Sequence, residues 1–453
     1  MAAIPTTVIR HVLVMTESQH EQLQTAFGQD WSVETAAFLF AHAVPTPGGA
    51  YRLLITDVVV PPQDAYEQRT ANRLTLSAAY MAQIYQQARG HRGAVIQAHS
   101  HPDGSLEPST IDLANEAQTL PRLRYHAPGQ PHGRMIVTPA ALHARLFLLD
   151  GQDADLHVQV VGRSLRQLNF LTPTQDETYD RQIRAFGAAG QAQLRHLRVA
   201  VVGSGGTGSL AAQQLAHLGV GHIRMYDDDL LEDTNLNRVV GTVPDDVGRP
   251  KVDISAELTR RIQPTISAEP RQEDITVQQV ARSLLDVDIV MACTDSQGSR
   301  AILSQLAYQY LLPVIDVGIN IHVLPSGAVH ISGRIQMLSP SLPCLLCTDS
   351  LDLAKVRTDL MTAGARQADP YVRGEDVKEP AVISLNSTAV GVAISMLLSA
   401  VTGLPIPSRY TLLKLDQSQM RTPEMVARPG CAHCSEQGAY SQGDTWTAPG
   451  RPE

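Results

Sequence analysis

The segment that most constrains the fold is LRVAVVGSGGTGSLAAQQLAHLGVGHIRMYDDD, which spans residues 197–229. It reads as an apolar strand, a glycine-rich turn, a helix and a second strand. This order is typical of a doubly wound sheet of parallel strands with helices on its faces. The pattern begins near Tyr179, and we expect the domain that contains it to cover residues 179–436.

The rest of the chain has different patterns. Residues 1–162 mix strand-like segments with helical ones near residues 17–28 and 75–89, which predicts a separate mixed α/β domain. Residues 163–178 have weak periodicity and a Pro, so we expect a linker there. Residues 437–453 are polar and rich in Gly and Pro, and we expect a disordered tail.

Composition excludes several classes of partner. The 453 residues include 36 Lys plus Arg and 45 Asp plus Glu, and a net charge of −9 argues against nucleic acid or an anionic membrane. We expect no apolar run to reach the roughly 20 residues that span a bilayer, and the N-terminus lacks the pattern of a secretory signal. Four of the five cysteines form two CxxC pairs, which suits a metal in a reducing compartment. We expect a cytoplasmic protein.

A candidate hydrolytic site lies in the first region. The stretch HSHPDGSLEPSTID, residues 99–112, fits the pattern H-x-H-P-x6-S-x2-D without a gap. Residues two apart on a strand point to the same face, so His99 and His101 can reach one zinc ion. Asp112 adds an oxygen ligand, and three protein ligands leave a position for a water molecule, as in catalytic zinc sites.

This site needs a base and an oxyanion donor. We expect Glu34 to deprotonate the water, with Glu17 and Glu21 as alternatives, and Ser109 to hydrogen-bond the oxyanion of the tetrahedral intermediate. The alternative interpretation makes the two histidines ordinary surface residues of a loop.

A second candidate site follows the first strand of residues 197–229. Gly203, Gly205 and Gly208 form G-x-G-x-x-G, with Gly206 adding backbone freedom, and such a turn brings the backbone close to a phosphate at a helix N-terminus. Asp227 ends the second strand, where a carboxylate can bind ribose hydroxyls. Taken alone, the turn also fits a nicotinamide dehydrogenase.

Further polar residues favour ATP. We expect three polar groups beside the same turn: the amide of Asn235, the guanidinium of Arg238 and the ammonium of Lys251. An adenylating site needs such groups, because negative charge develops on the α-phosphate and on the departing pyrophosphate. Asp295 follows another apolar strand, where it can hold Mg²⁺ with the phosphates. Upstream, Arg181 is a further candidate to reach a phosphate.

The two CxxC pairs predict a structural metal site. Cys344, Cys347, Cys431 and Cys434 supply four thiolates, which complete a closed tetrahedral zinc site without an open position. Its expected role is to attach the C-terminal segment to the domain. A redox CxxC is disfavoured because neither pair begins a thioredoxin-like helix, and His433 is expected to be a bystander.

The first region resembles the JAMM (JAB1/MPN/Mov34) metalloproteases, which cleave after the C-terminal glycine of ubiquitin-like proteins. The resemblance implies a cytidine-deaminase-like α/β fold and zinc on His99, His101 and Asp112. It also implies Glu34 as the base and Ser109 at the oxyanion.

The second region resembles the ubiquitin-activating superfamily in its compact bacterial, ThiF-like form. The motifs that carry this resemblance are Arg181-Gln182, the GxGGxG turn, Asp227 with Asp229, NLxR, Lys251, Thr294-Asp295 and both CxxC pairs. The resemblance implies a Rossmann-like domain that adenylates a C-terminal glycine with ATP and Mg²⁺. It also implies a homodimer in which Arg181 reaches the partner's nucleotide. The usual Gln after NLxR is Val239 here.

Many relatives in that superfamily carry a nucleophilic cysteine in a crossover segment. Here the segment, near residues 368–390, contains no cysteine, and Cys293 is expected to be a packed structural thiol. A hydroxyl of Ser384, Ser387 or Thr388 is a weak substitute, because serine needs an activating base. The chain is therefore expected to stop at the acyl-adenylate.

Together these sites predict a bifunctional enzyme that cleaves after the C-terminal glycine of a bacterial ubiquitin-like protein and also activates that glycine for protein conjugation. In the alternative, the same reactions process and adenylate a ubiquitin-like sulfur carrier for synthesis of a sulfur-containing metabolite. A conjugating enzyme or a sulfurtransferase is the expected further partner. An inactive scaffold and a nicotinamide dehydrogenase remain as hypotheses of other classes.

Overall fold

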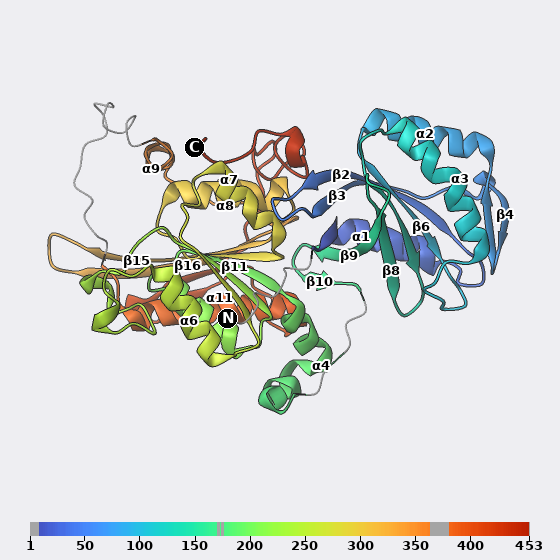
Figure 1. Ribbon diagram of the computed structural model, residues 1–453. Coiled ribbons are helices and arrows are strands. Elements are labelled where there is room, and N and C mark those ends of the chain that lie inside the picture. Colours follow the sequence, from blue (N-terminus) through green and yellow to red (C-terminus); the bar gives the residue numbers. More distant parts are fainter. Residues whose placement is uncertain (1–8, 170–172, 174–175, 363–379, 453) are drawn as a thin grey trace. The chain divides into compact units, whose positions relative to one another are not determined.

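The computed structural model describes residues 9–169, 173, 176–362 and 380–452, and the chain divides into two compact units (Figure 1). The first unit comprises Met1–Val161, Arg166–Phe170 and Ser441–Thr445, and the second comprises Gly162–Leu165, Leu171–Tyr440 and Trp446–Glu453. Both units are mixed α/β, as the sequence predicted.

The first unit is built on an eight-stranded mixed sheet in the order β1-β3-β2-β6-β7-β8-β9-β10. These strands are β1 (His11–Thr16), β2 (Ala36–Pro45), β3 (Tyr51–Val59), β6 (Ala94–Ser100), β7 (His132–Val137), β8 (Leu142–Phe147), β9 (Asp153–Val161) and β10 (Leu165–Gln167). Because β9 pairs with both β8 and β1, the sheet returns to its first strand. A separate hairpin consists of β4 (Tyr66–Thr70) and β5 (Arg73–Leu76).

Helices cover both faces of this sheet. They are α1 (Glu17–Gly28), α2 (Ala78–His91) and α3 (Thr110–His126), with a short 3-10 turn η1 (Gln63–Ala65). Successive residues of β2 point to opposite faces of the sheet. Leu39 packs in the hydrophobic cluster that includes Phe27 of α1. Phe40 packs in the cluster on the other face, which includes Ile84 of α2 and Leu123 of α3. The period of two along β2 therefore fixes which face each helix covers.

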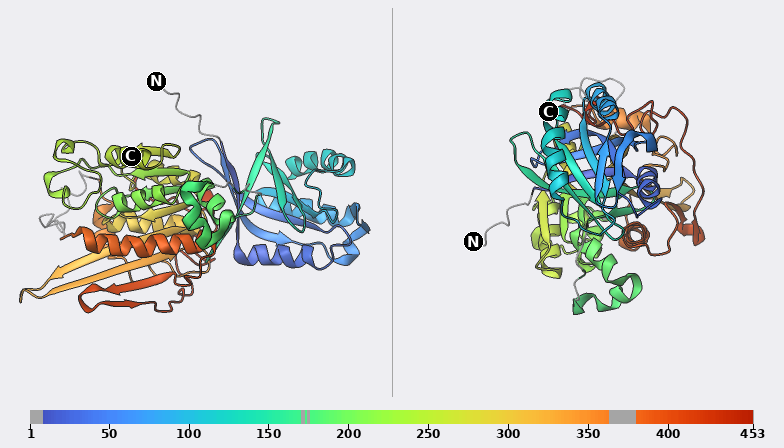
Figure 2. Two further views of the ribbon diagram at one scale, coloured as in Figure 1. Left: turned by 90° about the horizontal axis from the view of Figure 1, so that it is seen from below. Right: turned by 90° about the vertical axis from the view of Figure 1, so that its right-hand side faces the viewer.

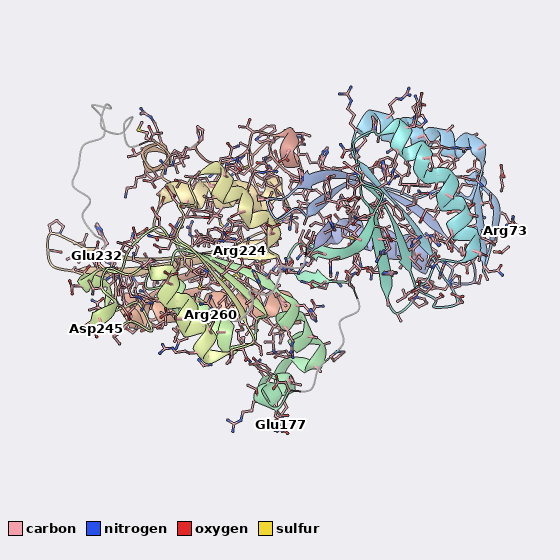
Figure 3. The ribbon with its side chains drawn as sticks, in the orientation of Figure 1. Arg73, Glu177, Arg224, Glu232, Asp245 and Arg260 are labelled. Atoms are coloured by element: carbon pink, nitrogen blue, oxygen red, sulfur yellow. The ribbon has the colours of Figure 1, made fainter. Side chains whose placement is uncertain are left out.

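The second unit holds another eight-stranded sheet, in the order β13-β12-β11-β14-β15-β16-β17-β18. These strands are β11 (Arg198–Val202), β12 (His222–Tyr226), β13 (Ser267–Arg271), β14 (Ile289–Ala292), β15 (Val314–Val323), β16 (Val329–Leu338), β17 (Tyr410–Lys414) and β18 (Gln419–Arg421). Across β12 and β13, Arg224 faces Glu269 in register and donates to its carboxylate at 2.7 Å; Figure 3 labels Arg224 among the side chains of these strands.

The expectation of a parallel sheet holds for only part of this unit. Strands β13 to β15 are parallel, but β16, β17 and β18 pair antiparallel. The connection between β15 and β16, residues 324–328, is too short for a crossover and closes as a hairpin, with Gly327 at a φ of +82°. The antiparallel pairing of β15 with β16 therefore follows from this local turn, whereas β17 joins the sheet after α11 and pairs with β18 through the short connection at η6.

Seven described α-helices belong to the second unit: α4 (Asp180–His196), α5 (Gly208–His217), α6 (Lys251–Ile262), α7 (Gln278–Ser283), α8 (Gln297–Gln309), α9 (Leu353–Asp359) and α11 (Ile383–Thr402). Short 3-10 turns are η2 (Glu177–Tyr179), η3 (Asp233–Asn235), η4 (Pro244–Asp246), η5 (Leu284–Asp286) and η6 (Leu415–Gln417), while η7 (Gly443–Thr445) belongs to the first unit.

Helix α11 runs along the sheet of the second unit, as the long orange helix of Figure 2 shows, and packs against β15, β16, α4 and α5. By length and mean hydropathy it is a candidate membrane span, so the expectation that no apolar run is long enough is wrong by that measure. Half of its most apolar window is buried inside the protein, as is common for a core helix, so it is weak evidence for a membrane.

Two segments contain more regular or packed structure than the sequence predicted. Residues 165–167, inside the predicted linker, form strand β10, and the Arg409 guanidinium donates to the carbonyl of Arg163 at 2.6 Å. The tail that was predicted to be disordered has described and partly buried residues from 437 to 452: Ala439 is fully buried, and Arg451 forms an ion pair with Asp274 at 2.6 Å. Composition averages over a segment, and individual contacts such as these decide its structure.

Candidate active sites and metal centre

The glycine turn lies where the strand order of the second sheet reverses. The chain passes from β11 to β12 on one side and later to β14 on the other, and ligands bind at the carboxyl ends of strands beside such a point. Gly203 has a φ of +89°, and a β-carbon there would lie 2.6 Å from the carbonyl oxygen of Cys293. A β-carbon at Gly208 would lie 1.7 Å from the carbonyl oxygen of Gly203. The turn therefore packs backbone against backbone.

Gly205 and Gly206 differ from these two. A β-carbon at Gly205 would meet nothing within 4 Å, whereas one at Gly206 would lie 2.5 Å from Nδ2 of Asn386 and 3.3 Å from Cδ of Arg238. Neither residue has a positive φ. A side chain at Gly206 would collide with the side chains of Asn386 and Arg238. The position therefore requires a residue without a β-carbon, and the expectation that Gly206 supplies backbone freedom is corrected.

The acidic residues after β12 form one network with the turn. Asp227 accepts hydrogen bonds from the amides of Ser204 at 2.6 Å and Asp229 at 2.9 Å. Burial raises the pKa of Asp227, and the charge of Lys251 opposes that rise. Lys251, the first residue of α6, is buried and donates to the carboxylate of Asp229 at 2.6 Å. The structure thus brings a carboxylate and an ammonium together beside the turn.

The loop after these acids presents an amide and a guanidinium. Asn235 is buried in η3, and its side-chain oxygen accepts from the amide of Glu232 at 3.2 Å. Arg238 donates to the carbonyl of Thr234, and its aliphatic carbons lie against Gly206. Of the two predicted groups, the side chain of Arg238 reaches the turn directly.

Asp295 follows β14 and is exposed at the same edge of the sheet. The residue before it, Thr294, accepts two hydrogen bonds through its carbonyl from the guanidinium of Arg300, at 3.1 and 3.0 Å. Asp316 is fully buried behind this loop and accepts from Arg334 at 2.6 Å. Sequence reasoning missed Arg300, Asp316 and Arg334, because no motif of the sequence joins positions on α8, β15 and β16.

Arg181 lies apart from the turn. It is exposed in the first turn of α4, and no contact to the glycine turn is seen among the described residues. Its neighbour Gln182 donates to the carbonyl of Leu218 at 3.0 Å and to Gln191 at 2.6 Å, which attaches α4 to the end of α5. The role of Arg181 across a dimer stays a prediction.

The remaining candidate nucleophiles are weak. Burial raises the pKa of Cys293 to about 12, so this thiol stays protonated at neutral pH. Ser387 and Thr388 each donate to a carbonyl one turn earlier in α11, of Ile383 and Ser384 respectively. The segment at residues 363–379 lies outside the described residues, and its sequence contains no cysteine.

The four paired cysteines form one cluster. The sulfurs of Cys344 and Cys347 are 3.6 Å apart, and those of Cys431 and Cys434 lie 3.4 Å from Cys344 and Cys347 respectively. These separations exceed a disulfide bond of about 2 Å and are close to the roughly 3.8 Å expected around a tetrahedral zinc ion. The amide of Arg428 donates to the sulfur of Cys347 at 3.2 Å. The donor set therefore fits a structural zinc ion.

The predicted ligands of the first unit also converge. Nε2 of His99 lies 3.0 Å from Nε2 of His101, and the Asp112 carboxylate lies 3.4 Å and 3.3 Å from these two atoms. Nδ1 of His101 faces the carbonyl oxygen of Ser105 at 2.9 Å, so Nδ1 carries the proton and Nε2 is left with a lone pair. Two imidazole nitrogens and a carboxylate that face one point fit a zinc ion.

Glu34 lies beside this cluster because of strand register. Strands β2 and β6 pair antiparallel as far as Ala36 opposite His99, and the amide of Ser100 donates to the carbonyl of Thr35 at 2.9 Å, which brings the segment at Glu34 alongside the two histidines. Glu34 is buried, and burial raises the pKa of its carboxyl although the two imidazoles oppose the rise. The alternatives Glu17 and Glu21 lie on α1.

A hairpin fixes the backbone at Glu34. The amide of Glu34 donates to the carbonyl of Thr70 at 2.8 Å, and the Arg69 guanidinium donates to the carbonyl of Glu34 at 2.9 Å. Arg69 also donates to the hydroxyl of Thr35 at 2.6 Å. Sequence reasoning missed Arg69, because its contacts join segments more than thirty residues apart.

Ser109 forms a capping interaction with one of the predicted ligands. It is the N-cap of α3: its hydroxyl oxygen accepts from the amide of Asp112 at 3.1 Å, and its own amide donates to the Asp112 carboxylate at 2.7 Å. This capping box orients the ligand Asp112. The hydroxyl proton is not used in the capping box, so the oxyanion role stays a prediction.

Comparison with known proteins concerns the second unit. The model of the ThiF family matches residues 179–435. The SAMP-activating enzyme E1 of Haloferax volcanii is 33% identical over 180 residues, which are 39% of this chain and 63% of that protein. The molybdopterin-synthase adenylyltransferase of Escherichia coli is 28% identical over 57% of this chain and 96% of its own.

A third relative, the adenylyltransferase and sulfurtransferase uba4 of Emericella nidulans, is 28% identical over 58% of this chain. The matched part spans 53% of that protein, and 63% of the Haloferax protein, so less than two thirds of either. The crystal structure of E. coli MccB with MccA-N7isoASN aligns over 58% of this chain and 76% of its own at 18% identity, with a TM-score of 0.48.

Proposed function

Because this chain belongs to the ThiF family, we propose that its second unit uses ATP to adenylate the C-terminal glycine of a ubiquitin-like sulfur carrier. The observation that carries the proposal is the convergence of Arg238, Lys251 and Asp227 on the glycine turn at the strand-order reversal. Dinucleotide binding would require no such set of cations.

In the proposed reaction, a carboxylate oxygen of the glycine attacks the α-phosphorus of ATP. The bond from this phosphorus to the bridging oxygen of pyrophosphate breaks, and pyrophosphate leaves with the electron pair. Backbone amides of the turn hold the phosphates, Arg238 and Lys251 offset the negative charge that develops, and Asp227 accepts from the ribose. Asp295 would hold Mg²⁺, which neutralises charge on the phosphates when bound.

The positions of the five cysteines fit a role in sulfur transfer better than a role in protein conjugation. All cysteines other than Cys293 belong to the four-sulfur cluster, and Cys293 is a buried thiol. The chain then has no thiolate to form a thioester with the activated carrier. A persulfide of another protein can attack the acyl-adenylate directly, and relatives named for molybdopterin synthase and for sulfurtransferase activity support this proposal.

Carrier-dependent ATP–pyrophosphate exchange tests the adenylation. Asp295→Asn is expected to lower exchange by about a hundredfold or more, because removing a metal-binding charge from an active site costs several kcal/mol. Asp245→Asn is the matched control, since Asp245 (Figure 3) is exposed on η4 and no contact of its side chain with the Gly203–Gly208 turn is seen among the described residues. No exchange by the wild-type protein with any ubiquitin-like carrier would overturn the proposal.

A homodimer with a shared site is part of the proposal. If Arg181 acts across the dimer, Arg181→Ala and Asp295→Asn each inactivate, yet a mixture of the two variants recovers exchange. A hybrid dimer then contains one site with both residues intact. Failure of the mixture to recover activity, with sedimentation showing exchange of subunits, would rule out a role in trans.

The first unit supports a second candidate function, hydrolysis after the C-terminal glycine of the same carrier. The observation that favours it is the convergence of His99, His101 and Asp112, with Glu34 buried beside them. A zinc ion held there would supply a water of lowered pKa. Glu34 would take a proton from that water and deliver it to the leaving amine, and Ser109 would donate to the oxyanion.

Glu34→Gln tests the hydrolase. Cleavage of a carrier extended beyond its glycine is expected to fall by about a hundredfold or more, because general-base catalysis contributes that much. Metal analysis should find the zinc content of this variant unchanged. Glu21→Gln, on α1, is the matched control. Equal cleavage by Glu34→Gln and the wild type would exclude Glu34 as the base.

A further inference from the structure

The first turn of α11 brings a carboxamide to the glycine turn. Asn386 is 5% exposed, and a β-carbon at Gly206 would lie 2.5 Å from its Nδ2 atom. The aliphatic carbons of Arg238 approach the same point at 3.3 Å. Gly206 therefore has an amide donor beside it as well as the stem of the guanidinium already assigned to the phosphates.

This carboxamide has no partner among the residues that the structure describes. The backbone amide of Asn386 donates to the carbonyl of Val382 at 3.1 Å, but no hydrogen bond of the side chain is seen within the described ranges. Neither amide atom of Asn386 is among the fully buried, unpartnered atoms of the described residues, so the carboxamide keeps some exposed surface from which it can donate to a ligand. Nδ2, the amide atom beside Gly206, carries two protons and can donate to an acceptor held at the turn, while Oδ1 likewise has no partner within the described ranges.

The start of α11 adds a favourable field for an anion. Val382, its N-cap, supplies no side-chain hydrogen bond, so the first amides of this 20-residue helix are not capped by it. Open amides and the helix dipole favour negative charge at a helix N-terminus. The glycine turn likewise opens α5 at Gly208. An acceptor that carries negative charge is therefore the expected partner of Asn386.

We infer that the Nδ2 group of Asn386 donates a hydrogen bond to a phosphate of the nucleotide held by the Gly203–Gly208 turn. This inference rests on the proposed adenylation and adds a residue of α11 to its binding site. Asn386 contacts the phosphate through a neutral group, so its hydrogen bond adds to the charges that Arg238 and Lys251 supply.

Equilibrium binding of ATP, with adenosine as the phosphate-free probe, tests the inference. Asn386→Ala is expected to weaken ATP binding about tenfold, as for loss of a hydrogen bond to a charged group. Asn386→Asp keeps the shape of the side chain but places a negative charge against the phosphate, and should weaken ATP binding more. Adenosine affinity should stay unchanged in both. Ser395→Ala, whose hydroxyl only donates to the Gly391 carbonyl within α11, is the control.

The outcomes separate the two proposals. If the wild-type protein binds no ATP, the proposed adenylation fails. If the wild type binds ATP and both Asn386 variants bind it equally well, the inference fails and the adenylation stands. If ATP and adenosine weaken in parallel, Asn386 only shapes the turn, which also overturns the inference. Should Asn386→Ala not fold, the isosteric Asn386→Asp gives the same decision.

Discussion

At the glycine turn, adjacent residues of one type meet different physical limits. Gly208 begins α5 with its Cα so close to the Gly203 carbonyl that any β-carbon would overlap it, at 1.7 Å. Gly205 lies two positions after Gly203 and has open space around it. The motif G-x-G-x-x-G gives these positions the same letter. Gly208 is required for close backbone packing, whereas Gly205 has free space around it.

Gly208→Ala is expected to destabilise the protein by about 3 kcal/mol, because the overlap is with backbone, which cannot rotate away. Gly205→Ala should leave the free energy of unfolding within about 1 kcal/mol of the wild type. Denaturant unfolding of the two variants checks this. Equal stabilities would mean that the backbone at the turn relaxes freely.

At the scale of elements, the β4–β5 hairpin sets the position of a candidate catalytic group. Besides Arg69, the hairpin supplies Tyr66, whose hydroxyl accepts from the amide of Ala36 at 3.2 Å. The Arg69 guanidinium also lies 4.9 Å from the centre of the Tyr66 ring. The backbone around Glu34 is therefore held from the hairpin, and β2 begins just after it.

Arg69→Ala should loosen this segment. We expect a loss of about 1–3 kcal/mol in stability, because hydrogen bonds from a charged group to the Glu34 carbonyl and the Thr35 hydroxyl disappear. Hydrogen exchange of the Glu34 amide should become faster, and cleavage by the first unit should fall with it. Arg73→Ala is the control, because Arg73 is exposed at the start of β5 (Figure 3). Unchanged exchange in Arg69→Ala would contradict this role.

At the scale of the whole molecule, the cysteine cluster joins distant parts of the chain. Cys344 and Cys347 follow β16, whereas Cys431 and Cys434 come 87 residues later. Beyond them, Arg451 pairs with Asp274 near the start of α7. The C-terminal residues thus belong to the folded protein, and the metal is expected to contribute to global stability.

Cys431→Ser should remove zinc from the four-cysteine cluster and lower the unfolding midpoint by about 10 °C, since a structural zinc contributes several kcal/mol to folding. Elemental analysis and thermal unfolding measure both effects. His101→Ala should remove zinc only from the first unit, with a smaller change in the midpoint. A full zinc content in Cys431→Ser would contradict a four-thiolate site.

Buried histidines predict sensitivity to acid. Burial lowers the pKa of His132 to about 4, and its Nδ1 accepts from the amide of Val95 at 3.2 Å. The other histidines whose pKa is lowered to about 4 are His20, His91, His222 and His433. In the unfolded chain these groups bind protons near pH 6.5, whereas the folded protein resists protonation until about pH 4.

The free energy of unfolding is therefore expected to fall as pH decreases from 6.5 to 4, by up to about 1.4 kcal/mol per pH unit for each such histidine. His132→Asn keeps an acceptor for Val95 and removes one titrating group, so its stability should depend less on pH in this window. Urea unfolding at several pH values measures the slope. A slope equal to that of the wild type would show that His132 does not contribute.

Local patterns of the sequence were enough for much of this protein. The strand, turn and helix around Gly203 were predicted because glycine content and apolar periodicity act over neighbouring residues. The cysteines come together as predicted, and so do His99, His101 and Asp112. Both metal-site predictions relied on Cys, His and Asp at short spacings that are common in metal sites and uncommon elsewhere. Composition alone misjudged residues 437–452 and the apolar helix α11.

Contacts between segments that are distant in the sequence could not be predicted from the spacing of residues, and only the tertiary structure shows them. It brought Glu34 beside the cluster of His99, His101 and Asp112 through the pairing of β2 with β6, joined Arg69 to the Glu34 backbone, and brought Asn386 of α11 to Gly206. It also turned the end of the second sheet antiparallel. The physical reason is that burial and hydrogen bonding depend on which segments meet in space, and these segments lie from about thirty to 180 residues apart in the chain.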